Sequence, residues 1–235
     1  MSKSSDARDG FDRTAAVTRS LLGWGVVVGA FYLVLGLAQA FVRDGFDLAR
    51  HPLSLLMLGD FGWVQTVNLI LSGLMVLAAA VGFARAMRGT SAAGWAATLL
   101  GVFGVCLIAS GVFPPDPMAG FPDAATSTDA TASGVLHLAF GAVGFVCLAA
   151  AAFVVGGWFD RQQAPAFART SRIGGAVVVV GFIGGAVLST QAVGVLSLWV
   201  AVVAGFAWLA AASVQLYRTV PHPDAHRRDV GARAL

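Results

Sequence analysis

Histidine, aspartate and serine side chains gather in two short segments that separate long apolar stretches, and at the start of the stretch after the second segment. The side chains with this placement are His51, Ser54, Asp60, Asp116, Asp123 and His137. Imidazole and carboxylate groups together bind divalent cations such as zinc, so His51, Asp116 and His137 form a candidate metal site. A water bound to such an ion would be the nucleophile of a hydrolase.

Ser54, near a histidine and an aspartate, also fits nucleophilic catalysis. The sequence contains no HExxH, GxSxG or paired-cysteine motif that would support either chemistry. We therefore assign no catalytic residue. Binding of a lipid headgroup or a small solute is favoured over an enzymatic reaction.

A second polar feature lies inside an apolar stretch. Gln65, Asn68 and Ser72 are spaced three and four residues apart, so they share one face of a helix. Polar groups at membrane depth are costly and face the protein interior or a water-filled cavity. This face either fixes helix packing through hydrogen bonds or forms one wall of a polar pocket, which makes Gln65 and Asn68 pocket candidates.

The composition indicates whether the chain folds in water or in a lipid bilayer. The chain has 235 residues, of which 57% are hydrophobic and 11% charged, with a mean hydropathy of +0.79. Soluble domains carry about 25% charged residues, so the composition excludes a soluble globular protein, a disordered chain and a disulfide scaffold. The sequence pI is about 9.4, but the basic residues flank apolar runs instead of forming one patch, which argues against a nucleic-acid partner.

Six stretches have the length and apolarity that a membrane-spanning helix needs. Their approximate limits are Leu21–Val42, Phe61–Ala84, Ala92–Phe113, Val135–Phe159, Ile173–Val193 and Leu196–Tyr217. Because backbone groups in lipid must be satisfied within the segment, we expect an all-α integral membrane bundle of six transmembrane helices. We expect a flexible segment over residues 1–17, a transmembrane domain over 18–218 and a flexible tail over 219–235.

The basic residues indicate the orientation of this bundle. Thirteen of the 15 Lys and Arg residues fall on the side that holds both termini, and only Arg43 and Arg50 fall on the other. We expect the protein in the plasma membrane, where the positive-inside rule places both termini in the cytoplasm. The histidines and aspartates of the two segments then lie on the outer side. A cleaved signal peptide ending at Ala38-Gln39-Ala40 is the alternative, but the apolar run is longer than usual for one.

Two small-residue motifs predict close helix packing. Gly25 and Gly29 lie four residues apart in the first stretch, as do Gly181 and Gly185 in the fifth. Such spacing lets two backbones approach, either within the bundle or across the interface of a homo-oligomer.

The two polar segments also resemble a known family. The matching residues are His51-Pro52-Leu53-Ser54 with Gly59, Trp63, Gln65 and Asn68, then Phe113-Pro114-Pro115-Asp116-Pro117, Gly120-Phe121-Pro122 and Gly134-Val135-Leu136-His137. In these motifs the chain, over about residues 20 to 217, is similar to the membrane family known as domain-of-unknown-function family 998. The resemblance implies a small bacterial protein with about six helices and no established reaction. This chain departs from the family pattern at Leu55-Leu56-Met57, where many relatives have an acidic or polar residue after the serine. This difference weakens the case for a catalytic role there.

Three functions therefore remain open. The favoured one is a multi-pass membrane protein that binds a lipid headgroup or small solute in an outward-facing polar pocket. The candidate residues of this pocket are His51, Ser54, Asp60, Gln65, Asn68, Asp116 and His137. The second is a metal-dependent membrane hydrolase that uses His51, Asp116 and His137. The third is a structural or assembly partner in the membrane. We expect membrane lipids as partners.

The segment between Arg50 and Asp60 is too short to cross the bilayer, and we expect a helix lying in the interface after Pro52.

Overall fold

The computed structural model describes residues 11–118, 120–122, 130–189 and 191–224. Within these ranges there are six long helices and one short 3-10 helix. Their bounds are α1 Arg13–Val42, η2 Leu53–Met57, α2 Gly62–Ala86, α3 Ser91–Val112, α4 Ala132–Arg161, α5 Pro165–Val187 and α6 Ala192–Thr219. Each long helix is long and apolar enough to cross a membrane, so the predicted all-α bundle of six spans is confirmed.

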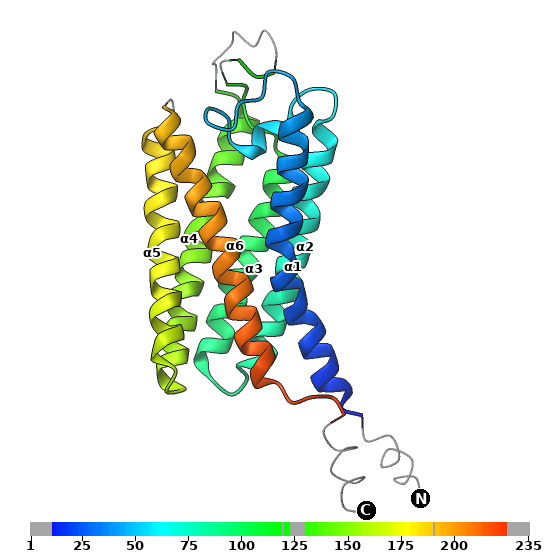
Figure 1. The fold of residues 1–235 in the computed structure, drawn as a ribbon, viewed down its shortest axis with the longest axis vertical. Coiled ribbons are helices and arrows are strands. Elements are labelled where there is room, and N and C mark those ends of the chain that lie inside the picture. Colours follow the sequence, from blue (N-terminus) through cyan, green and yellow to red (C-terminus); the bar gives the residue numbers. More distant parts are fainter. Residues whose placement is uncertain (1–10, 119, 123–129, 190, 225–235) are drawn as a thin grey trace, which may run out of the picture.

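The six helices form a ring (Figure 1). Each helix packs against the next one in the chain, and α6 returns to α1 and closes the ring. α6 also contacts α2 and α4 across the middle of the bundle. The ring therefore has an interior that side chains from several helices share.

Both described ends of the chain lie at one end of the bundle, which we call the terminal end (Figure 1). The backbone N–H of Asp12 donates to the Pro223 carbonyl over 2.9 Å, so the two ends touch. We call the opposite end, where the described residues 43–61, 113–118, 120–122, 130–131, 188–189 and 191 lie, the loop end. Which end faces the cytoplasm stays a prediction from the charge distribution.

α1 begins earlier than the apolar run that predicts it. Asp12 caps the helix because its carboxylate accepts a hydrogen bond from the N–H of Ala15 over 2.9 Å. Residues 13–17, which the sequence assigned to a flexible segment, are therefore helical. Residues 1–10 and 225–235 lie outside the described residues, as do Asp123 and Thr190.

The two glycine motifs pack inside the chain. A Cβ at Gly29 would come within 2.7 Å of the Phe206 Cβ, and one at Gly181 within 2.7 Å of the Ser197 carbonyl oxygen. A Cβ at Gly25 would overlap the Ser213 hydroxyl, and one at Gly185 would lie 3.0 Å from Leu198. Both faces thus lie against α6 of the same chain. The close helix packing predicted for Gly25/Gly29 and Gly181/Gly185 is therefore present within the chain, and a homo-oligomer through these faces stays a prediction.

The segment after Pro52 differs from the interfacial helix that we expected. It forms the single-turn helix η2, and its apolar side chains Leu53, Leu55, Leu56 and Met57 are all buried. Two glycines make room for it, since a Cβ at Gly36 would lie 2.8 Å from Leu53 and one at Gly62 would overlap the Met57 carbonyl. The leucines therefore pack between α1 and α2 at the loop end of the bundle and do not lie against lipid.

Candidate functional site

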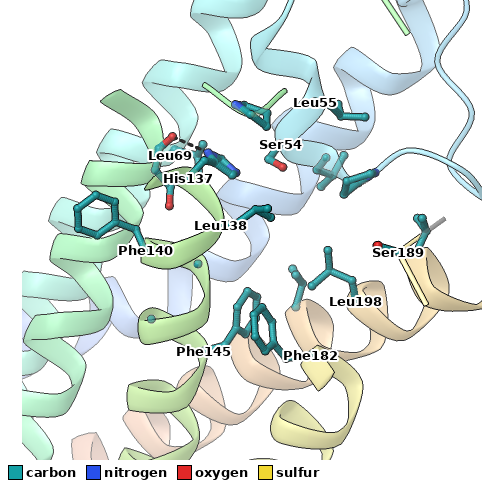
Figure 2. A pocket seen from close by; sticks show the side chains of 18 of the residues that line it. Ser54, Leu55, Leu69, His137, Leu138, Phe140, Phe145, Phe182, Ser189 and Leu198 are labelled. Carbon is teal, nitrogen blue, oxygen red and sulfur yellow. Dashed lines mark hydrogen bonds between the residues drawn. The ribbon is translucent and has the colours of Figure 1, made fainter. Parts of the chain in front are cut away.

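A large cavity lies inside the ring at the loop end. Its volume is about 940 Å³, within the range of about 300–1,000 Å³ that small-molecule sites occupy. Most of its lining comes from η2, α3, α4 and α6, with residues 50, 52, 115–118, 189 and 191 of the loop end. The helices α1, α2 and α5 contribute one residue each, which are Tyr32, Leu69 and Phe182. Figure 2 shows His137 and Ser54 at one end of this space and Phe145 and Phe182 at the other.

The part of the cavity farther from the loop end is apolar and rich in aromatic rings. Phe145 of α4 stacks on Phe182 of α5 with ring centroids 5.0 Å apart. Phe206 of α6 contacts Tyr32 of α1 at 5.2 Å and Phe103 of α3 at 6.3 Å. These rings line the cavity and give it walls suited to a hydrocarbon group.

The part at the loop end is polar. The lining residues there with polar or charged side chains are Arg50, Ser54, Ser110, Asp116, His137, Ser189 and Gln191. Arg50 is exposed and pairs with Asp47 at 3.6 Å. The cavity therefore changes from polar at its mouth to apolar in its depth.

His137 lies in the second turn of α4, and its ring orientation is fixed by α3. Its Nδ1 lies 2.8 Å from the Phe113 carbonyl oxygen and 3.1 Å from the Ser110 carbonyl oxygen. Carbonyl oxygens only accept hydrogen bonds, so Nδ1 carries the proton and donates. Nε2 is then the acceptor of the neutral ring, on a residue that lines the cavity.

Asp116 holds the segment before α4 against the start of that helix. Its Oδ1 accepts a hydrogen bond from the Thr131 hydroxyl over 2.6 Å, and its Oδ2 accepts one from the Thr131 N–H over 3.1 Å. The carboxylate sits where a Cβ of residue 134 would be, so Gly134 is required for this contact. The Ser133 hydroxyl adds a hydrogen bond to the Pro114 carbonyl over 2.8 Å. Asp116 thus fixes a wall of the cavity as well as lining it.

His51 lies outside the cavity lining. It is buried, its ring packs beside Phe46 and Phe121, and its Nδ1 accepts a hydrogen bond from the Asp47 N–H over 2.9 Å. The Arg43 guanidinium lies 5.2 Å from the Phe121 ring and donates to the Leu58 carbonyl over 2.5 Å. This cluster holds the two polar segments of the loop end together.

The structure does not gather His51, Asp116 and His137 into a metal site. Within the described residues, no group of three or more His, Cys, Asp or Glu side chains is placed to hold a metal ion. The His51 Nδ1, the His137 Nδ1 and both Asp116 oxygens already have hydrogen-bond partners in the chain. Of the three, Asp116 and His137 line the cavity and His51 does not.

The polar face of α2 fixes packing against α1. Gln65, Asn68 and Ser72 are fully buried and do not line the cavity. The Asn68 amide donates to the Tyr32 carbonyl over 3.0 Å and to Gln65 Oε1 over 3.1 Å, and the Gln39 amide donates to the same Oε1 over 3.0 Å. We call Gln65, Asn68 and Ser72 of α2, together with Gln39 and the Tyr32 carbonyl of α1, the α1–α2 polar ladder. It matches the first of the two interpretations left open by the sequence.

Of the seven pocket candidates, three therefore line the cavity: Ser54, Asp116 and His137. Gln65 and Asn68 belong to the α1–α2 polar ladder, His51 belongs to the loop cluster, and Asp60 is exposed outside the lining.

The sequence analysis missed most of the lining. On α3 the lining residues Phe103, Cys106, Leu107 and Ser110 follow helical spacing, which is the same pattern that ordinary packing produces. On α6 the lining includes Trp199, whose Nε1 donates to the Leu48 carbonyl over 3.1 Å and ties α6 to the loop after α1. An apolar stripe carries no signal that separates a cavity wall from a filled core.

Six apolar helices in one bundle make the chain a multi-pass membrane protein. A comparison with family models matches residues 26–215 to the family described as "Protein of unknown function (DUF998)". The match covers most of the chain, so the chain belongs to this family, as the motifs of the two polar segments indicated. Comparisons with curated proteins and with solved structures each returned no match.

Proposed function

We propose that this protein binds a membrane lipid, or another amphipathic molecule, in the large cavity. The observation that carries the proposal is the change along one cavity of about 940 Å³ from the polar mouth at Ser54, Asp116 and His137 to the aromatic depth at Phe145 and Phe206. An amphipathic ligand has the same two parts, and an apolar site with a few placed polar groups is the usual form of a small-molecule site. The sequence left a lipid headgroup or a small solute open, and the apolar depth favours the lipid.

The position of Leu138 supports entry from the bilayer. Leu138 lines the cavity and its exposed fraction is 70%. In Figure 2 its side chain projects from α4 into the space that separates α4 from α5 and α6. Two turns further into the bundle, the Phe145–Phe182 stack brings α4 and α5 together. The lipid would therefore enter between the loop ends of these helices.

The mouth supplies both donors and acceptors for a headgroup. The Ser54 hydroxyl does both, the His137 Nε2 accepts, and the Arg50 guanidinium donates. With both termini in the cytoplasm, as the arginine distribution predicts, this mouth faces outward across the cell membrane. The protein would then act on the outer leaflet.

The other two functions have less support. The metal-dependent hydrolase needs His51 beside Asp116 and His137, and His51 lies outside the cavity lining. The assembly partner needs available glycine faces, and those faces pack against α6 of the same chain. Lipid binding requires only the polar residues at the mouth and the aromatic residues in the depth, and all of these line the cavity.

A cavity-filling substitution tests the proposal. Gly141 lines the cavity, and a Cβ there would meet no atom within 4 Å. Gly141→Leu therefore adds a side chain at the cavity wall, and its Cβ has open space. Gly101 of α3 is a matched control, because its Cβ would also meet nothing and it does not line the cavity.

The readout is mass spectrometry of lipid retained through purification in a mild detergent. We expect the wild type and Gly101→Leu to retain a lipid at near one per chain. We expect Gly141→Leu to retain less than about a third of that amount, which a loss of about 2 kcal/mol in binding free energy would produce from near-saturating lipid. Equal retention by the two glycine variants would contradict the proposal.

A further inference from the structure

A second cavity lies at the terminal end, far from the first. Its volume is about 220 Å³. A water molecule occupies about 30 Å³ in the liquid, so this cavity has room for a group of several heavy atoms. It forms where α1 begins and where α2 and α6 end, three helix ends that lie together in Figure 1. Its lining residues are Asp12, Thr14, Ala15, Thr18, Arg85, Ala86, Arg88, Thr219, Val220 and Pro221.

Two arginines give this cavity a positive charge. Arg85 is partly buried and Arg88 is exposed. Neither is among the ion pairs found in the described part of the chain, which are Arg50–Asp47, Arg172–Asp160 and His222–Asp224. The guanidinium groups at this site therefore have charge to offer to a ligand.

The Arg85 side chain is held in place by a buried threonine. Its Nε donates to the Thr18 hydroxyl over 3.0 Å, and that hydroxyl donates to the Thr14 carbonyl over 2.8 Å. Thr18 has an exposed fraction of only 2%. An arginine fixed at Nε presents its terminal nitrogens without the entropy cost of ordering a free side chain.

The lining contains one acidic residue, Asp12, which has a hydrogen-bond partner within the chain. The Asp12 carboxylate accepts the N–H of Ala15 and so caps α1. The first N–H groups of any helix have no partner within the helix, and they favour an anion. At the start of α1, which is Arg13, the Asp12 carboxylate occupies that place, so the positive charge of the cavity comes from Arg85 and Arg88.

The depth of the cavity in the membrane indicates the source of the anion. The apolar run of α1 begins near Leu21 and that of α2 ends near Ala84, so this cavity lies where the helices leave the hydrocarbon. Phospholipid phosphates lie at that level, and basic pockets between transmembrane helices bind anionic headgroups. Arginine suits phosphate because its planar fork can donate two parallel hydrogen bonds.

We propose that the Arg85/Arg88 cavity binds the phosphate group of an anionic phospholipid. This site is at the opposite end of the bundle from the large cavity and does not depend on the function proposed for it. Inorganic phosphate shares the same chemistry, so the experiment must separate the two sources.

The test measures thermal unfolding of the full chain in a neutral detergent. The additions are short-chain phosphatidylglycerol, phosphatidylcholine with the same acyl chains, and inorganic phosphate. A ligand that binds the folded state raises the unfolding temperature in a concentration-dependent way. We expect phosphatidylglycerol to stabilise the wild type at concentrations at least about tenfold lower than either of the other two, because Arg85 and Arg88 add charge attraction and the acyl chains add burial.

The variants assign the effect to this cavity. We expect Arg85→Gln with Arg88→Gln to weaken the response to phosphatidylglycerol about tenfold or more, since charge-assisted hydrogen bonds are lost. The double variant Arg161→Gln with Arg169→Gln removes the same charge from exposed positions at the same end and should shift the response less than about twofold. Arg88→Gln alone changes an exposed side chain, so it provides a folded variant if the loss of the Arg85–Thr18 hydrogen bond prevents purification.

Three results would overturn the proposal. The first is equal stabilisation by phosphatidylglycerol and phosphatidylcholine. The second is stabilisation by inorganic phosphate at the same concentration as the anionic lipid, which would assign the cavity to free phosphate. The third is an equal loss of response in the control pair, which would make the effect one of net charge at the terminal end.

Discussion

The α1–α2 polar ladder predicts a substitution that lowers stability without changing ligand binding. Asn68 is fully buried and joins α2 to the Tyr32 carbonyl of α1. Asn68→Leu keeps the number and branching of the side-chain heavy atoms and removes every hydrogen bond that this side chain makes. Because Asn68 does not line the large cavity, the substitution leaves the proposed ligand site intact.

The expected size of the effect follows from the three hydrogen bonds lost. The Asn68 amide no longer donates to the Tyr32 carbonyl over 3.0 Å or to Gln65 Oε1 over 3.1 Å, and its Oδ1 no longer accepts from the Ser72 hydroxyl over 3.5 Å. Side-chain hydrogen bonds in helical membrane proteins contribute on average about 0.6 kcal/mol and at most about 1.7 kcal/mol. The Gln65 Oε1 keeps its bond from Gln39, so little further cost arises from an unsatisfied acceptor. We expect Asn68→Leu to lower the free energy of unfolding by about 1–2 kcal/mol.

The assay is reversible unfolding in mixed micelles, followed by tryptophan fluorescence, together with the measurement of retained lipid. Val67→Leu is the control, because Val67 is the neighbouring residue and its exposed fraction is 42%. It should change stability by less than about 0.5 kcal/mol. If Asn68→Leu lost bound lipid while its stability matched that of Val67→Leu, the polar face of α2 would be a ligand wall and the reasoning would be wrong.

Other predictions concern the loop end, metal and orientation. Gly134→Ala should displace the Asp116 carboxylate and cost about 1 kcal/mol in unfolding free energy, as measured by the same method, because two partly exposed hydrogen bonds are lost. Trp199→Phe keeps an aromatic ring but loses the bond to the Leu48 carbonyl, and should cost about 0.5–1.5 kcal/mol. Treatment with a chelator should leave the unfolding temperature unchanged, and a decrease reversed by zinc would restore the metal hypothesis. A green fluorescent protein fused to the C-terminus should fluoresce in cells, whereas an active alkaline phosphatase fusion would reverse the predicted orientation.

The helices could be predicted because their signal is local. A stretch of about 20 apolar residues has one good solution in a bilayer, and all six stretches adopt it. The limits shifted where polar residues extend a helix beyond the hydrocarbon, as at Arg13 and Thr219. The fifth stretch, predicted to run to Val193, ends earlier as α5 at Val187, and α6 begins at Ala192. The segment after Pro52 was assigned to the interface because its leucines look lipid-seeking, but small residues at Gly36 and Gly62 leave space for it inside.

The site could be predicted only in part, because its geometry depends on how the helices lean against one another. Helical spacing correctly placed Gln65, Asn68 and Ser72 on one face, but spacing does not say whether that face meets α1 or a cavity. His51 and His137 look equivalent in the sequence. Their positions differ because His51 turns back onto the Asp47 N–H, whereas His137 is carried into the bundle by the second turn of α4.

The most direct test of the account is photo-crosslinking with a phospholipid that carries a diazirine in its acyl chain, followed by peptide mapping. If the large cavity holds a lipid, the adducts should concentrate on cavity-lining residues such as Phe103, Leu148 and Phe206, and should decrease in Gly141→Leu. Adducts confined to bilayer-facing residues such as Val34 and Val180, with no difference between the wild type and Gly141→Leu, would show that the cavity does not bind lipid.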